Sequence, residues 1–108
     1  MIDQDLIRRA VELADGWCVV DDHDGYWLMF RDGDGWHSRS ASRWWQLGLD
    51  ALAAQLVRQV DAAGYDFESD YDGWATVSHP SGEPITHSIG PDRTENTIRA
   101  CMEFFDGR

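Results

Sequence analysis

The chain has 108 residues, and its 20 acidic residues against 9 basic ones give a net charge of −11 at pH 7. Every basic residue is an arginine. Direct binding to nucleic acid is not expected, because such affinity comes mostly from neutralising phosphates with Lys and Arg. A field of negative sign favours a basic partner instead.

Length and hydropathy predict one soluble domain over residues 1–108. The hydrophobic content of 43%, with six tryptophans, is enough for a packed core. No apolar run approaches the roughly 20 residues of a membrane span, and the acidic N-terminal sequence MIDQD is unlike a signal peptide. We therefore expect a cytoplasmic protein that does not associate with membranes.

The first half of the chain predicts one helix followed by three strands. Over residues 3–14, apolar residues recur at spacings of three and four, as on one face of an amphipathic helix. Gly16 follows, where a left-handed residue ends a helix at the least steric cost. Three runs of strand-forming residues are separated by Asp-Gly turns. They are residues 17–20, 26–30 and 36–40, of which the second is apolar enough to be central and the third polar enough to be an edge.

Residues 43–48 (RWWQLG) have no counterpart elsewhere in the chain and are expected to form a loop that folds aromatic side chains onto the body. Asp50 is expected to cap a second helix that runs to residue 63. The inward-facing residues of this helix are predicted to be Leu52, Leu56, Val60 and Ala63, with Ala53 and Val57 beside them.

The second half repeats the pattern of the first. Gly64 ends the second helix, and strands are predicted at residues 65–68, 74–78 and 84–89. Pro84 suits an edge strand, where a missing ladder donor costs little. A third helix is predicted over residues 94–105. One face of it carries Ile98, Cys101, Met102 and Phe105, with Phe104 beside them.

These elements predict an α+β domain of the order α-βββ-α-βββ-α. We expect an antiparallel sheet of two β-meanders with three amphipathic helices packed on it. An Asp-x-Asp-Gly-aromatic motif occurs at residues 22–26 and again at residues 70–74, which defines halves of about 3–40 and 50–89. Two interpretations stay open: a true internal duplication, or a chance similarity of turn chemistry.

The chain resembles the phage ABA sandwich family of prophage proteins. The resemblance lies in Gly16-Trp17, the stretch Ser40-x-x-x-Trp44-Trp45-x-x-Gly48, Asp72-Gly73-Trp74-x-Thr76-Val77, and the closing stretch of residues 97–102. Arg43 stands near a position where that family often has Asp. The resemblance implies an α/β sandwich fold and a phage or prophage origin in a bacterial host. It implies no activity, because the family has none established.

Motifs for metal binding and catalysis are weak. Carboxylates around two turns offer oxygen ligands of the kind Ca²⁺ prefers, but the EF-hand glutamate is missing and Asp-Gly turns need these residues for backbone reasons; they are Asp21, Asp22, Asp24, Asp32 and Asp34. No Gly-x-Ser-x-Gly or phosphate-loop lysine occurs. Cys18 and Cys101 lie in apolar patterns and are expected to be reduced core thiols. We expect no metal, no cofactor and no enzymatic activity.

Two sets of residues are candidates for binding. Trp44 and Trp45, with Arg39 and Arg43 nearby, have the composition of an interface hot spot, although either tryptophan alone would equally serve to fill a core. The second set is two acidic clusters at equivalent turns, which would imitate a phosphate backbone if both faced one way. Their members are Asp22, Asp24, Asp70 and Asp72, with Asp66 and Glu68 nearby.

The sequence therefore favours a non-enzymatic module that binds a basic protein, such as an inhibitor of a nucleic-acid-binding host protein in counter-defence or host takeover. One alternative is a protein that sequesters nucleotides by Trp stacking and by Arg39 and Arg43. A further alternative is a structural or oligomeric phage component, in which the edge strands at 36–40 or 84–89 pair between chains.

Overall fold

The computed structural model describes residues 4–22, 25–32, 35–40, 45–70 and 73–107, and side chains over residues 5–18, 49–70 and 73–107. Its described part is an α+β fold with three helices and antiparallel strands, which confirms the predicted class. The helices are α1 (Gln4–Leu13), α2 (Trp45–Ala62) and α3 (Arg93–Asp106). The strands are β1 (Trp17–Asp22), β2 (Gly25–Asp32), β3 (Gly35–Ser40), β4 (Asp66–Asp70), β5 (Trp74–Ser78) and β6 (Pro84–Ile89).

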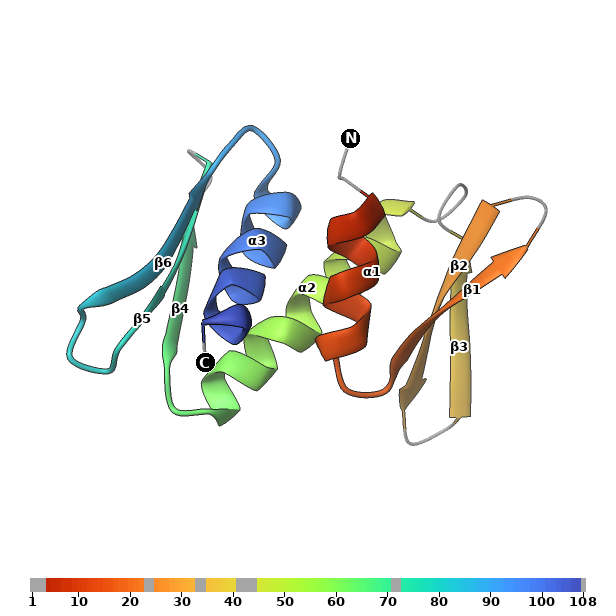
Figure 1. Ribbon diagram of the computed structural model, residues 1–108, viewed down its shortest axis with the longest axis horizontal. Coiled ribbons are helices and arrows are strands. Elements are labelled where there is room, and N and C mark those ends of the chain that lie inside the picture. The colour runs from red at the N-terminus through yellow and green to blue at the C-terminus, as the bar shows by residue number, and fades with distance from the viewer. Residues whose placement is uncertain (1–3, 23–24, 33–34, 41–44, 71–72, 108) are drawn as a thin grey trace.

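The strands form two separate three-stranded sheets, in the orders β1-β2-β3 and β4-β5-β6, and every neighbouring pair is antiparallel. The two sheets lie at opposite ends of the longest axis, with the helices between them (Figure 1). The prediction that all three helices pack on one sheet is therefore wrong. An 18-residue helix, α2, separates β3 from β4, and its length of about 27 Å keeps the two sheets apart.

Helix α2 begins at Trp45, five residues before the predicted cap at Asp50. The expected loop over residues 43–48 is thus wrong for residues 45–48, while residues 43 and 44 lie outside the described residues. The apolar spacing of Leu49, Leu52 and Leu56 continues the helical pattern backwards to Trp45. Gly48 lies inside this helix, where a glycine costs only about 1 kcal/mol relative to alanine.

The described core lies between the helices and the inner face of β5. Helix α3 packs across β5 and β6 and against α2, and α1 contacts both other helices. Ala63 follows the last residue of α2 and is exposed, so its predicted inward position is wrong. Phe104 is buried, whereas Phe105 is only half-buried. The buried apolar residues are Ile7, Ala10, Val11, Ala14, Leu49, Leu52, Ala53, Leu56, Val60, Ala75, Val77, Ile98, Ala100, Cys101, Met102 and Phe104.

A single side-chain amide joins α3 to the end of the β5–β6 pair. Asn96 is 2% exposed, and its Nδ2 donates to the carbonyl oxygens of Gly73 at 3.0 Å and Gly90 at 2.9 Å. Gly73 precedes β5 and Gly90 follows β6, and the Gly90 N–H donates to the Gly73 carbonyl at 2.9 Å. We call this arrangement the Asn96 clamp. Asp92 caps the same helix by accepting from the Glu95 N–H at 3.0 Å.

Gln59 makes the corresponding link between α1 and α2. Its Nε2 donates to the Leu13 carbonyl at 2.8 Å, and its Oε1 accepts from the Asp15 N–H at 2.7 Å. One amide therefore satisfies both an orphan carbonyl at the end of α1 and a donor in the following turn. A salt bridge links α1 to α3: Arg9 Nη2 lies 2.5 Å from Asp106 Oδ1. Within the described residues, no helix has both the length and the apolar character to cross a membrane.

The Asn96 clamp predicts different costs for two glycines with similar backbone angles. Gly73 (φ +96°) and Gly64 (φ +90°) both disfavour a side chain, but an added Cβ at Gly73 would lie 2.5 Å from the Gly90 oxygen, whereas Gly64 has open space. We expect Gly64→Ala to cost about 1–2 kcal/mol of unfolding free energy from the left-handed backbone alone. Gly73→Ala should cost about 3 kcal/mol or more, because the clamp hydrogen bonds are also displaced. Urea denaturation measures both, and equal losses would contradict the clamp.

Candidate functional site

The strand β4 separates an acidic side from a side that faces the helices. Side chains alternate across a strand, and Phe67 and Ser69 turn inward while Asp66, Glu68 and Asp70 turn outward. Asp66 and Glu68 are exposed, and Asp70 is half-buried. These three predicted site residues are thus brought together in one row along a single strand.

The other two strands continue this outer side with uncharged residues. Ala75 and Val77 of β5 are buried toward α3, which leaves Trp74 and Thr76 on the opposite side. On β6, Thr86 bonds the Ala100 carbonyl of α3 at 2.8 Å and Ser88 is buried, so His87 and Ile89 point outward. We call this side the outer face. It is formed by Asp66, Glu68, Asp70, Trp74, Thr76, Ser78, Ile85, His87 and Ile89.

Two cross-strand rows give the outer face an acidic edge and an apolar edge. Asp70, Trp74 and Ile89 stand in one register, and Glu68, Thr76 and His87 in the next. Thr76 Oγ1 lies 2.6 Å from His87 Nδ1, and the rings of Trp74 and His87 stack with centroids 6.1 Å apart. Ile89 is 74% exposed. An aromatic and aliphatic strip therefore lies beside the acidic row.

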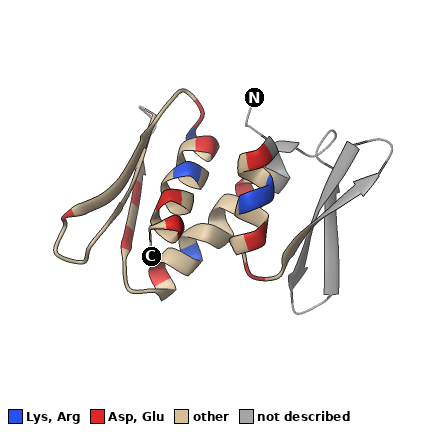
Figure 2. Cartoon of the chain, in the orientation of Figure 1, with Lys and Arg blue, Asp and Glu red and all other residues tan. Residues whose placement is uncertain are grey.

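No described helix or strand covers the outer face. Figure 1 shows α3 on the other side of the β4-β5-β6 sheet, facing the centre of the molecule. In Figure 2 the acidic positions of this sheet lie along β4, while β5 and β6 are free of charged residues. The face is therefore accessible, with charge at one edge and apolar surface at the other.

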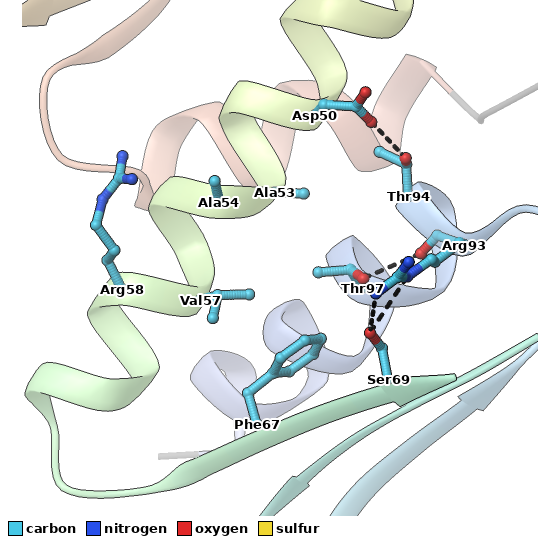
Figure 3. Close-up of a pocket in the computed structure, with 10 residues that line it drawn as sticks. All are labelled: Asp50, Ala53, Ala54, Val57, Arg58, Phe67, Ser69, Arg93, Thr94 and Thr97. Carbon is cyan, nitrogen blue, oxygen red and sulfur yellow. Dashed lines mark hydrogen bonds between the residues drawn. The ribbon is translucent and has the colours of Figure 1, made fainter. Parts of the chain in front are cut away.

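A groove lies between β4, α2 and the first turn of α3. Its volume is about 630 Å³, and Figure 3 shows Val57 of α2 near Phe67 of β4, with Ala53 extending toward α3. Ser69 and Thr97 also line it. The groove is thus apolar between α2 and β4 and polar toward α3.

Two arginines and one carboxylate stand around this groove. Arg93 donates to Ser69 Oγ from Nη2 at 3.2 Å and from Nε at 3.4 Å, and the Thr94 hydroxyl donates to Asp50 Oδ1 at 2.6 Å (Figure 3). Arg58 is exposed on α2 and donates to Gln55 at 3.0 Å. The groove is therefore lined by two guanidinium groups and by the Asp50 carboxylate, which accepts the Thr94 hydroxyl.

The other predicted site residues do not join this site. Asp22 ends β1 in the other sheet, so the described members of the two acidic clusters do not form one surface (Figure 1). Arg39 lies on β3 in register with Leu28, and Trp45 is the first residue of α2; their side chains lie outside the described part. Asp24, Arg43, Trp44 and Asp72 lie outside the described residues.

Sequence reasoning missed the apolar half of the outer face and the groove. The alternation in PITHSI places Ile85, His87 and Ile89 on one side of a strand. It does not indicate which side of the sheet remains uncovered. Because α3 covers the side with Thr86 and Ser88, the isoleucines are left outside. The groove joins residues of three elements that no local pattern brings together.

Both cysteines are free thiols. Cys101 is fully buried in α3, and burial raises its thiol pKa to about 12. Cys18 is half-buried rather than a core residue. Among the residues whose side chains are described, no three His, Cys, Asp or Glu are grouped to hold a metal ion. The turn carboxylates at Asp21, Asp22, Asp24, Asp32 and Asp34 are not among those side chains.

Comparison with known proteins gives no relative: no family model, no curated protein and no solved structure matches this chain.

The burial of Cys101 predicts selective thiol chemistry. The thiolate is the reactive form, and raising the pKa from 9.0 to about 12 makes the thiolate fraction at pH 8 roughly a thousandfold lower. An aromatic disulfide reagent should therefore modify Cys18 and spare Cys101 in the native protein, and modify both in denaturant. Peptide mass spectrometry after timed quenching measures both rates. Equal native rates would show that Cys101 is not buried in solution.

Proposed function

We propose that this chain is a non-enzymatic binding module whose outer face docks a basic region of another protein. The observation that carries the proposal is the uncovered sheet face, where Asp66, Glu68 and Asp70 stand beside Trp74 and Ile89. An uncovered side of an antiparallel sheet usually carries polar residues. Exposed Ile85 and Ile89, with the half-buried Trp74 beside them, favour a contact surface there.

The acidic row acts as one charged feature. Alternate residues of a strand are about 6.7 Å apart, which is shorter than the Debye length of about 8 Å at physiological ionic strength. Three carboxylates at this spacing present a combined negative field, and the net charge of −11 has the same sign. Such a field accelerates encounter with a basic partner and selects against acidic ones.

The resemblance to phage ABA sandwich proteins supports a phage or prophage origin and a place in the bacterial cytoplasm. Inhibition of a basic or nucleic-acid-binding host protein fits that origin. We also propose that the two halves arose by duplication. In both, a helix is followed by a positive-φ glycine, Gly16 at 80° and Gly64 at 90°, and then by three antiparallel strands.

The acidic row predicts the effect of removing its charge. The variant Asp66→Asn, Glu68→Gln, Asp70→Asn should weaken capture of a basic protein from bacterial lysate roughly tenfold, if each exposed pair contributes about 0.5 kcal/mol. Wild-type capture should fall between about 50 and 500 mM salt.

A matched variant removes the same charge elsewhere. Asp15→Asn, Asp61→Asn, Glu103→Gln changes three exposed carboxylates of the helices and their connections, and it should retain the captured protein. If both variants lose capture equally, only the net charge matters and the outer face is not the contact.

A second candidate function, the sequestration of nucleotides, is favoured by the groove with Arg58, Arg93 and Phe67. Guanidinium groups suit phosphates, and an aromatic ring suits a base. A thermal-shift screen tests it, because a nucleotide at 100 times its Kd should stabilise the fold by roughly 2.7 kcal/mol. No shift with any common nucleotide at millimolar concentration would remove this function.

A further inference from the structure

We propose that the free edge of β4, together with the groove beside it, receives an extended segment of the basic partner as an additional strand. The inference rests on the proposed function and deepens it, because it states how the partner is held. Strand addition at a sheet edge is a general mode of peptide recognition: main-chain bonds provide affinity, and alternate side chains provide specificity.

Among the described strands, β4 lies at one edge of its sheet, and its register shows which backbone groups point outward. Hydrogen-bonded and non-bonded pairs alternate in an antiparallel ladder, and the Gly90 N–H bonds the Gly73 carbonyl. Gly73 and Gly90 are thus a hydrogen-bonded pair, and every second residue of β5 after Gly73 also bonds to β6. These residues are Ala75 and Val77. Trp74 and Thr76 therefore direct their backbone groups to β4.

The same alternation continues onto β4. Trp74 and Thr76 are in register with Asp70 and Glu68. The backbone N–H and C=O groups of these two acidic residues therefore form hydrogen bonds with β5. The N–H and C=O groups of Phe67 and Ser69 point to the free edge. A segment laid along this edge can thus bond to both residues.

The groove lies where the inward side chains of such a segment would fall. The side chains of Phe67 and Ser69 form one wall of the groove, and Ala53 and Val57 of α2 form the opposite wall (Figure 3). An added strand would lie about 4.8 Å from β4. Its inward side chains would then cover Val57 and Phe67, both of which are only half-buried in the free protein.

The two sides of the edge demand different chemistry. Outward side chains of the added strand would stand beside Asp66, Glu68 and Asp70, which favours Lys or Arg. Inward side chains would meet apolar Val57 and Phe67, and the exposed Arg58 disfavours a basic side chain there. The segment that fits therefore alternates basic and apolar residues.

Charge also decides between this occupant and a second copy of the chain. Two β4 edges placed together would juxtapose two acidic rows, and like charges directly opposite each other are destabilising. The other edge of the sheet, β6, begins with Pro84 and has a register shift near Ser78, both of which blunt an edge. A strand with basic residues is therefore complementary in charge to the acidic row on β4.

Fluorescence anisotropy with the labelled peptide Lys-Val-Lys-Val-Lys-Val-Lys tests the proposal. The alternating peptide should bind at least tenfold more tightly than a peptide of the same composition with its lysines and valines in separate blocks. N-methylation of one alternate set of residues should abolish binding, while methylation of the other set is tolerated. In an antiparallel arrangement the valine N–H groups bond to β4, so methylation of the valines abolishes binding. In a parallel arrangement the lysine N–H groups bond to β4, so methylation of the lysines does. Equal effects of the two methylations would overturn the added strand.

Protein variants complete the test. Val57→Arg places a charge over the groove and should weaken the alternating peptide at least tenfold, whereas Ala62→Arg adds the same charge at the exposed end of α2 and should not. If binding depends on the acidic row but not on alternation, methylation or Val57, the proposed function stands and the strand addition fails. If removing the acidic row has no effect on either peptide, both fail. A dimer by light scattering that dissociates on peptide addition would instead assign the edge to a second copy.

Discussion

The amide of Asn96 is the contact on which the arrangement of the C-terminal half depends. It satisfies two backbone carbonyls at the point where β5 begins and β6 ends, and it does so from the first turns of α3. A buried polar group without a partner costs about 1–3 kcal/mol, so this geometry fixes α3 against one side of the sheet in one orientation. The opposite side is left uncovered, and the free edge of β4 is left beside α2. Both surfaces that we assign to binding follow from this placement.

The order of elements and the class of fold could be predicted from the sequence because both depend on local patterns. Residues 74–78 and 84–89 were predicted as strands and have the same bounds as β5 and β6. The positive φ of Gly16 was predicted from the end of the first helix, and Gly64 was predicted to end the second. The beginning of α2 was missed, because residues 43–48 were interpreted as a loop although the leucine spacing continues back to Trp45.

The arrangement of these elements could not be predicted, because it depends on contacts between distant residues. Nothing in the local pattern indicates that the strands divide into two sheets on opposite sides of the helices. Asn96 is the only asparagine in the chain. The sequence gave no sign of its role, because both of its partners, Gly73 and Gly90, lie outside α3. Likewise, Asp66, Glu68 and Asp70 were recognised as an acidic group. That Trp74 and Ile89 lie on the same uncovered side could not be predicted, because it depends on α3 covering the other side of the sheet.

The strand pairing also bears on how the chain folds. In the described part, every ladder joins strands that are consecutive in the sequence, so each sheet forms by closing short loops, at low entropic cost. The links of greatest sequence separation are instead between helices, as in Arg9 with Asp106 and Leu13 with Gln59. Folding should therefore begin within each sheet and end with the docking of the helices. In that late step the N-terminal helix α1 meets the C-terminal helix α3.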